Sequence, residues 1–184
     1  MSARPAIRVA PLTAGDVARY RALMLHAYAA EPDAFTSTPA ERAALPESWW
    51  IARIADPEGL SRAFGAFDGD DLVGTVAIEF SAKPKTRHKA HIVGMFVKES
   101  ARGLGAGKAL VGAAIEAIAA RPGLRLVTLT VTEGNAPAVA LYNLFGFRAF
   151  GVEPMAIAAG EGFKSKVHMY LALGDPPAAS APTA

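Results

Sequence analysis

The stretch FVKESARGLGAGKAL, residues 96–110, runs from an apolar strand through a glycine-rich turn into an amphipathic helix. Gly103, Gly105 and Gly107 allow the backbone to approach a ligand closely. The helix that follows presents free N–H groups and the positive end of its dipole, which attract an anion. The stretch therefore predicts a phosphate-binding turn.

Two common nucleotide-binding loops do not fit this turn. A Walker A loop needs a glycine five positions before Gly107 and a Ser or Thr after Lys108, but the chain has Arg102 and Ala109 there. A dinucleotide fingerprint started from either of the first two glycines needs Gly or Ala where the chain has Lys108 or Leu110. These positions disfavour ATP and NAD, and with them a phosphotransferase or nucleotide-binding protein.

A second block follows at residues 127–147, VTLTVTEGNAPAVALYNLFGF. Val127, Leu129 and Val131 alternate with polar residues, as in a half-buried strand. Asn135 then opens a helix that Gly146 ends. The block therefore predicts a strand followed directly by a capped helix.

Together the two blocks resemble the GCN5-related N-acetyltransferase (GNAT) superfamily. RGLGAG, residues 102–107, resembles its pyrophosphate loop, and NAPAVALY, residues 135–142, resembles its second motif. The resemblance extends roughly over residues 5–173 and rests mainly on residues 90–150. It implies acetyl-coenzyme A (acetyl-CoA) as the donor substrate and N-acetyl transfer as the activity.

The expected fold is α/β (α+β), with a mixed, mostly antiparallel sheet and helices on both faces. Early strands joined as hairpins and later strands alternating with helices favour this class. The resemblance adds a V-shaped splay between the strand before the glycine turn and the next strand. One domain is expected over residues 1–173, with a disordered tail at 174–184. The expected strands are 7–10, 64–67, 72–80, 90–97, 126–132, 147–151 and 167–173, and the expected helices are 13–29, 47–55, 104–120 and 136–144, with a further helical segment from Thr38.

Composition excludes several classes of protein. The chain of 184 residues has no cysteine, which rules out disulfides, a thiolate metal site and an acyl-cysteine intermediate. Its 19 basic and 17 acidic residues give a net charge of only +2, so the chain lacks the strongly positive field that is typical of a nucleic-acid-binding protein. We expect no membrane segment, no metal and a cytoplasmic location. The basic run KPKTRHK, residues 83–89, is either a solvated loop or a docking site for an acidic substrate or a coenzyme A phosphate.

The resemblance assigns a set of residues to the donor. The pantetheine arm is expected along the strand before the turn, and the diphosphate at the turn itself, guided by charge from Arg102 and Lys108. Asn135 is expected near the pantetheine or diphosphate, a role compatible with an ordinary helix cap. The full set is Met95, Phe96, Val97, Arg102, Gly103, Leu104, Gly105, Ala106, Gly107, Lys108, Asn135, Ala138 and Tyr142.

Direct transfer requires a neutral amine, and at pH 7 only roughly 1 in 2,500 molecules of a lysine-like amine is neutral, a cost of about 4.6 kcal/mol. His91 is a candidate general base because imidazole titrates near neutrality. By the resemblance, it occupies the position of the base glutamate in the histone-modifying branch. Glu79 is a second candidate, acting directly or through water. The alternatives are an ordinary surface or core histidine and an exposed strand-edge glutamate.

Tyr142 occupies the general-acid position of the superfamily, where it would hydrogen-bond or protonate the departing thiolate; its alternative is a core tyrosine. Backbone amides around Phe96 would stabilise the oxyanion. The acceptor is a small-molecule or peptide amine, and the resemblance places Tyr28, Phe35, Trp49, Trp50 and Phe163 near it. The two tryptophans could instead pack a helix on the sheet. A coenzyme A sensor without activity is the alternative function, and a homodimer is left open.

Overall fold

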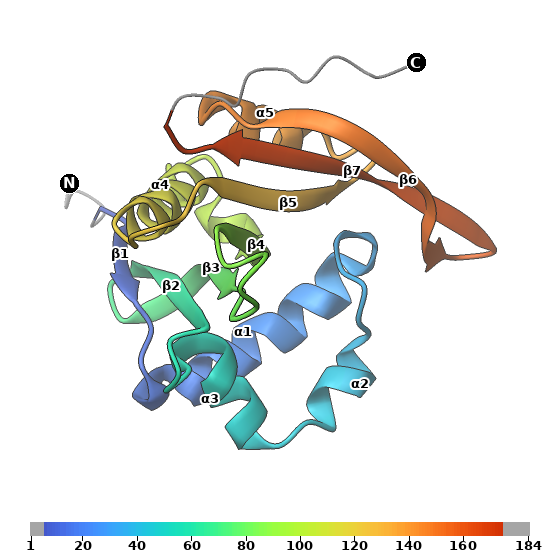
Figure 1. Cartoon of the computed structure of the whole chain (residues 1–184). Helices are drawn as coiled ribbons and strands as arrows, with labels where there is room; N and C mark the ends of the chain where they lie inside the picture. Colours follow the sequence, from blue (N-terminus) through green and yellow to red (C-terminus); the bar gives the residue numbers. More distant parts are fainter. Residues whose placement is uncertain (1–5, 175–184) are drawn as a thin grey trace, which may run out of the picture.

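A seven-stranded sheet organises the chain, with the strands in the order β1-β2-β3-β4-β5-β7-β6 (Figure 1). Neighbouring strands are antiparallel except for β4 and β5, which run parallel. The computed structural model describes residues 6–174, so 175–184 of the expected tail lie outside the described residues. The strands are β1 (Arg8–Pro11), β2 (Ser61–Asp68), β3 (Asp71–Phe80), β4 (Lys89–Val97), β5 (Leu126–Thr132), β6 (Arg148–Ala159) and β7 (Gly162–Ala172).

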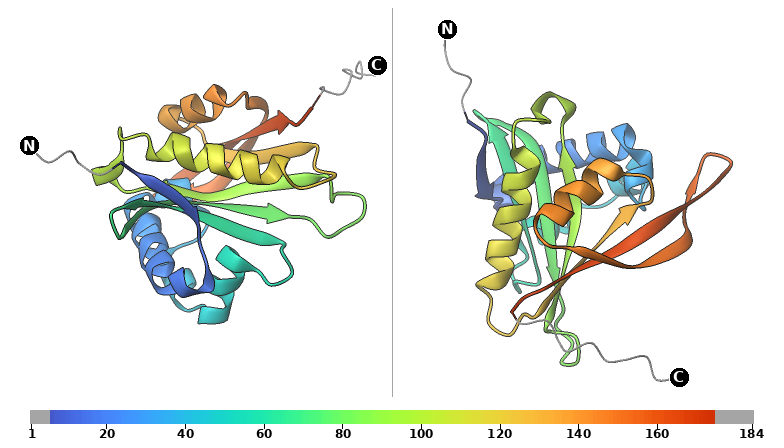
Figure 2. Two further views of the ribbon diagram at one scale, coloured as in Figure 1. Left: turned by 90° about the vertical axis from the view of Figure 1, so that its left-hand side faces the viewer. Right: turned by 90° about the horizontal axis from the view of Figure 1, so that it is seen from above.

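Helices cover both faces of this sheet (Figure 2). One face carries α1 and α3, with the short α2 beside α1, and the other carries α4 and α5. This arrangement confirms the expected mixed, mostly antiparallel fold. None of the helices between residues 6 and 174 has the length and apolar character needed to span a bilayer. The helices are α1 (Val17–Ala30), α2 (Pro39–Ala43), α3 (Glu47–Ala55), α4 (Ala106–Ala119) and α5 (Ala136–Leu144).

Polar caps start the helices where the sequence predicts. The backbone N–H of Thr13 donates to Asp16 Oδ2 at 2.9 Å, and a short 3₁₀ turn there leads into α1. Before α2, the Glu41 N–H donates to Thr38 Oγ1 at 3.2 Å, while the Thr38 N–H donates to Glu41 Oε2 at 2.7 Å. These reciprocal bonds satisfy N–H groups that the first helical turn leaves without partners.

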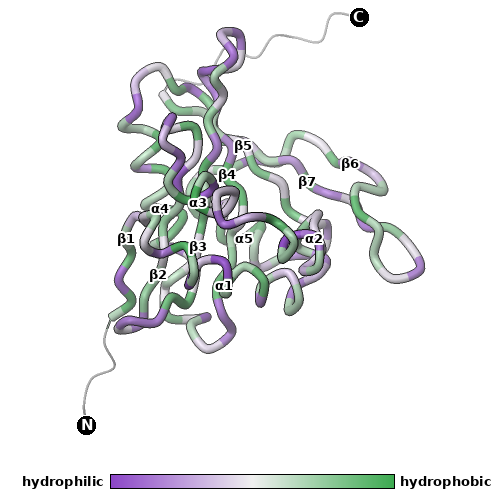
Figure 3. Tube along the Cα trace, turned by 90° about the horizontal axis from the view of Figure 1, so that it is seen from below, coloured by the Kyte–Doolittle hydropathy of each residue, from purple (hydrophilic) through white to green (hydrophobic). Residues whose placement is uncertain are grey.

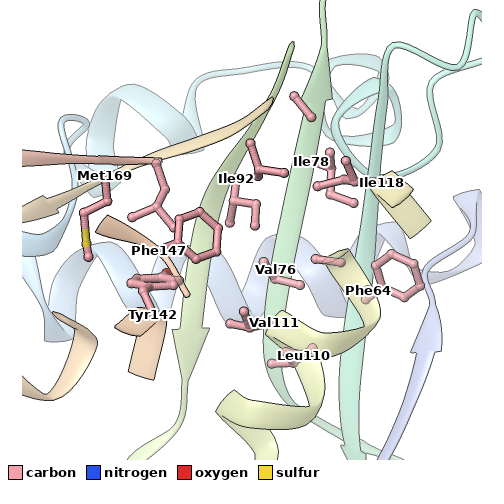
Figure 4. Close-up of a cluster of buried hydrophobic side chains, with 14 of the residues drawn as sticks. Phe64, Val76, Ile78, Ile92, Leu110, Val111, Ile118, Tyr142, Phe147 and Met169 are labelled. Carbon is pink, nitrogen blue, oxygen red and sulfur yellow. The ribbon is translucent and has the colours of Figure 1, made fainter. Parts of the chain in front are cut away.

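The core consists of two apolar clusters, one on each face of the sheet. Figure 4 shows the first, in which Leu110 and Val111 of α4 pack on Val76 of β3. Tyr142 lies at the edge of this cluster, next to Phe147. Packing of α4 and α5 on the sheet therefore fixes the glycine turn and Tyr142 relative to each other.

The β6–β7 hairpin is longer than predicted. The sequence predicts strands at 147–151 and 167–173, whereas β6 and β7 continue to a turn at residues 160–161. Register shifts between Ala149 and Gly151 and between Glu153 and Ile157 break the alternation of β6, and most of this strand is exposed. The hairpin extends away from the helices with alternating polar and apolar segments (Figure 3). Without a buried face, the sequence carries no period-2 signal there.

Candidate active site

The site lies where β4 and β5 separate. The two strands pair only from Lys89 to His91 on β4 and from Leu126 to Thr128 on β5. Both strands then continue to Val97 and Thr132 without pairing to each other, while β4 stays paired with β3 and β5 with β7. This confirms the expected V-shaped splay, which opens the middle of the sheet to a ligand.

A bulge in β4 faces this opening. Thr75 pairs with Phe96 and Ala77 pairs with Val93, so Gly94 and Met95 together oppose the single residue between them on β3. Gly94 adopts φ of +60°, a left-handed conformation that glycine accepts without strain. A bulge leaves one residue out of the ladder and redirects its backbone groups. Here the redirected groups line the space between the splayed strands.

A groove of about 830 Å³ runs from the splay to the glycine turn. Of the residues predicted to hold the donor, Leu104 and Tyr142 do not line the groove; the Leu104 side chain is 42% exposed, and Tyr142 lines an adjoining cavity. The predicted residues that line it are Met95, Phe96, Val97, Arg102, Gly103, Gly105, Ala106, Gly107, Lys108, Asn135 and Ala138.

The glycine turn presents a row of N–H groups to the groove. Gly103 and Gly105 adopt φ of +75° and +81°, a left-handed conformation that residues other than glycine rarely adopt. Within residues 6–174, the N–H groups of residues 103–108 donate no hydrogen bond. They lie at the N-terminal end of α4, a helix of 14 residues whose dipole favours an anion. A diphosphate fits this donor set.

Ion pairs hold the opposite wall of the groove in place. Arg102 donates to Glu31 Oε1 at 2.7 Å and to the Val97 carbonyl at 3.1 Å, which ties the turn to the end of α1. Lys164 of β7 donates to Asp33 Oδ2 at 2.5 Å, and the Thr132 hydroxyl donates to the Asp33 carbonyl at 2.6 Å. The segment after α1 thus bridges both sides of the splay.

A second cavity, of about 330 Å³, adjoins the groove between the bulge and α5. Met95, Asn135 and Ala138 line both spaces, so these residues mark the junction. Asn135 Oδ1 accepts from the Ala138 N–H at 3.2 Å and so caps α5, as predicted. The second cavity is large enough for a small molecule.

Tyr142 lines the second cavity beside this junction. Its side chain is 5% exposed and its ring lies 5.7 Å from that of Phe147 (Figure 4). Burial raises the pKa of Tyr142 to about 12. The phenol is therefore protonated at neutral pH and can act as a hydrogen-bond donor.

His91 also lines the second cavity, at the point where β4 and β5 part. Its Nδ1 lies 2.8 Å from Thr128 Oγ1, and that hydroxyl lies 3.4 Å from the Ala90 carbonyl. Since the carbonyl can only accept, a hydroxyl that donates to it accepts from Nδ1–H and leaves Nε2 unprotonated. Burial lowers the pKa of His91, which favours this neutral ring.

Glu79 pairs with His91 in the β3–β4 register but does not line the second cavity. Its carboxylate forms an ion pair with Arg53, and it is Arg53 that reaches the cavity. The structure therefore places Glu79 behind the site, where it orients a cationic side chain.

The structure separates the aromatic residues predicted around the acceptor. Tyr28 and Phe35 line the second cavity, with ring centroids 4.9 Å apart. Trp50 is 0% exposed and packs edge-on against Tyr20 in the core. Trp49 lies behind the cavity wall, and Phe163 is 60% exposed on β7 outside both spaces. Trp50 therefore packs α3 on the sheet, the alternative considered from the sequence.

Three basic residues of the second cavity had no sequence signal. Arg42 comes from α2, Arg53 from α3 and Lys166 from β7. Each lies far from the two motifs in the chain, and only the packing of these elements around the splay brings them together. By contrast, the basic run at 83–89 lies in the loop between β3 and β4 and in the first residue of β4, and it lines neither space.

The fold and this two-part site define an acetyltransferase of the GNAT type. The model of the acetyltransferase (GNAT) family matches residues 22–147, more than half of the chain. The protein therefore belongs to the GNAT family. It is also similar to L-amino acid N-acetyltransferase AaaT from Escherichia coli (strain K12), at 31% identity over 113 residues that cover 61% of this chain and 68% of the relative.

Solved structures show the same fold. A GCN5-related N-acetyltransferase from Kribbella flavida is 26% identical, with a TM-score of 0.75 over 91% of this chain and 98% of the other. The protein yncA from Salmonella typhimurium, solved with its cofactor acetyl-CoA, is 17% identical, with a TM-score of 0.76 over 97% of this chain and 100% of the other. These likenesses confirm the fold expected from the sequence.

Proposed function

We propose that this acyltransferase moves an acetyl group from acetyl-CoA directly to the primary amine of a small molecule or peptide, with both substrates bound at once. The observation that carries the proposal is the junction between the two spaces. A groove with free N–H groups at one end opens, at Met95, Asn135 and Ala138, into a separate cavity lined by Tyr142 and His91. The similarity to AaaT, named for L-amino acids, supports a small amine as acceptor.

The transfer needs one proton removed and one supplied. The amine nitrogen attacks the thioester carbon, the carbon–sulfur bond breaks, the amine loses a proton and the thiolate gains one. No covalent acyl-enzyme through cysteine is open to this chain, because it has no cysteine. Direct attack within a ternary complex is therefore the route proposed.

Tyr142 serves the departing thiolate mainly as a hydrogen-bond donor. A thiol has a pKa of about 8.5, so moving a whole proton from a phenol of pKa about 12 costs about 5 kcal/mol. A hydrogen bond to the developing charge avoids this cost and remains available over the whole physiological pH range. Backbone groups redirected by the bulge at Gly94 and Met95 supply the complementary oxyanion contact.

His91 is the proposed general base. It lines the cavity in a neutral state, and its Nε2 is the nitrogen that can accept a proton. Glu79 is the weaker candidate because its carboxylate is engaged by Arg53. His91 therefore offsets part of the cost of deprotonating the amine.

The proposal is tested in two steps. A thermal-shift comparison of acetyl-CoA, ATP and NAD asks which ligand binds the turn, and we expect stabilisation by acetyl-CoA. Thiol release across a panel of amines then asks whether transfer occurs, with the N-acetylated product identified by mass spectrometry. Stabilisation by ATP alone would contradict the donor assignment. Binding of acetyl-CoA without acceptor-dependent thiol release would instead indicate a coenzyme A sensor.

A further inference from the structure

The second cavity is positively charged. Arg42, Arg53 and Lys166 line it together with His91, and no Asp or Glu within residues 6–174 lines it. Lys166 is only 8% exposed; burial lowers its pKa, and the Glu153 carboxylate opposes this shift. An acceptor with several positive charges would be repelled here, whereas an anionic group would be attracted.

Three of the six Arg and Lys residues that line the two spaces form an ion pair with a carboxylate. Arg53 pairs with Glu79, and on the groove side Arg102 pairs with Glu31 and Lys164 with Asp33. In the second cavity, Arg42 and Lys166 have no such ion pair within residues 6–174, and Arg42 is the guanidinium of the two. The charge of Arg42 is thus left for a ligand to balance.

Aromatic rings hold the Arg42 guanidinium in a fixed place. It lies 4.4 Å from the ring centroid of Trp49 and 5.9 Å from that of Tyr28. Its Nε is buried and, in the described part of the chain, has no hydrogen-bond partner. A guanidinium stacked on aromatic rings keeps its planar fork available for an anion at low entropic cost.

Apolar walls complete the cavity. Tyr28 and Phe35 form an edge-to-face pair on one side, and Ile92, Val93 and Val131 lie on the strands. With a volume of about 330 Å³, the space fits a molecule that combines an amine, an anion and a short side chain. A small molecule is therefore large enough to fill the cavity, and a polypeptide chain is not needed to fill it.

We propose that the acceptor is a small amine that carries an anionic group, such as a carboxylate, and that Arg42 binds this anion. This assignment rests on the acetyl transfer proposed above, and it names the substrate class and a specificity-determining residue. Lys166 lines the same cavity, whereas the charge of Arg53 is already balanced by Glu79. The anion anchors the molecule at α2 and directs its amine toward the junction with the groove.

The test uses matched probe sets built on alanine, leucine and phenylalanine. Each set contains the free L-amino acid, its amide, the decarboxylated amine and the aminophosphonate. The amide has the lowest amine pKa, so a site indifferent to the anion would acetylate the amide best. We expect at least 10-fold higher kcat/KM for the anionic members, and comparison of carboxylate with phosphonate tells which anion is preferred.

Variants assign the preference to Arg42. Arg42→Met should lower kcat/KM for the anionic probes 10- to 100-fold. For the amines that lack an anionic group, kcat/KM should change less than 3-fold, and the acetyl-CoA Kd should stay unchanged. Arg42→Lys should recover part of the loss. Arg62→Met is the matched control, because Arg62 also lies over an aromatic ring, 5.1 Å from that of Phe64, but lines neither space of the site. Equal effects of Arg42→Met on amines with and without an anionic group would overturn the proposal.

A binding measurement separates this proposal from the proposed function. Calorimetry with the enzyme–coenzyme A complex should show binding of at least one anionic probe, weakened at least 10-fold by Arg42→Met. If no amine is acetylated but this Arg42-dependent binding is found, acetyl transfer fails and the anion site stands. If amines without an anionic group are acetylated and no anionic probe binds through Arg42, the anion site fails and acetyl transfer stands. Absence of both results overturns both proposals.

Discussion

Replacement of Tyr142 by phenylalanine removes the hydroxyl that we assign to the departing thiolate. A hydrogen bond to a charged group contributes about 1.5–3 kcal/mol, so we expect kcat to fall roughly 10- to 150-fold. The ring is retained, and with it the packing on Phe147 at 5.7 Å. Because Tyr142 does not line the groove, the acetyl-CoA Kd should stay unchanged.

The assay is thiol release at saturating acetyl-CoA and acceptor, with thermal unfolding as a check on the fold. Tyr170→Phe is the matched control, because Tyr170 contacts Phe150 on the β6–β7 hairpin and lines neither space of the site. Single-turnover kinetics establish whether chemistry limits the rate. A kcat within 3-fold of the original enzyme, with chemistry limiting, would refute the role of Tyr142.

Three further predictions concern the turn, the base and the core. Gly105→Ala places a side chain at φ of +81°, a strain of about 1–2 kcal/mol. The free turn should relax out of this conformation and binding must restore it, so calorimetry should show acetyl-CoA bound roughly 5- to 30-fold more weakly. Gly69→Ala, at φ of +61° in the β2–β3 turn, carries the same strain and should leave this Kd unchanged; equal weakening by both would refute a specific role for the turn. Burial lowers the pKa of His91 below its usual 6.5, so the pH profile of kcat/KM, which reports groups of the free enzyme, should show an acid inflection below pH 6.5 that His91→Gln abolishes; a retained inflection would assign the base elsewhere. As pH falls below 6.5, the His91 side chain takes up a proton in the unfolded state before it does so in the folded state, so the stability due to neutral His91 should be lost. Denaturant titration of the original protein and of His91→Gln would show this loss. Leu110→Ala, at a side chain that is 0% exposed, should lower the free energy of unfolding by about 3 kcal/mol in urea, and a loss below about 1 kcal/mol would contradict its place in the core.

Local signals in the sequence predicted the elements that carry the donor site. The glycines indicated a turn that a ligand can approach closely, and Asn135 indicated a helix cap. The structure has left-handed backbone at Gly103 and Gly105 and the Asn135 cap on α5. The helix predicted from residue 104 begins at Ala106, because residues 102–105 form the turn. These features depend on neighbours within a few residues, which is why sequence patterns reveal them.

The acceptor side depends on contacts between distant segments, and the sequence predicted less of it. Arg42 reaches the cavity only because α2 packs beside α1, and no motif marks that packing. The pair Trp49–Trp50 could not be oriented from the sequence, since the direction of each ring depends on how α3 meets the sheet. The splay was expected from the family resemblance and not from periodicity.

A crystal structure with acetyl-CoA tests the central claim most directly, namely that the thioester lies at the junction of the two spaces. We expect the diphosphate oxygens within hydrogen-bonding distance of the N–H groups of residues 103–108. The thioester sulfur should lie within reach of the Tyr142 hydroxyl, with the acetyl group directed toward the cavity that holds His91 and Arg42. A diphosphate bound away from the turn, or an acetyl group directed away from that cavity, would contradict the assignment.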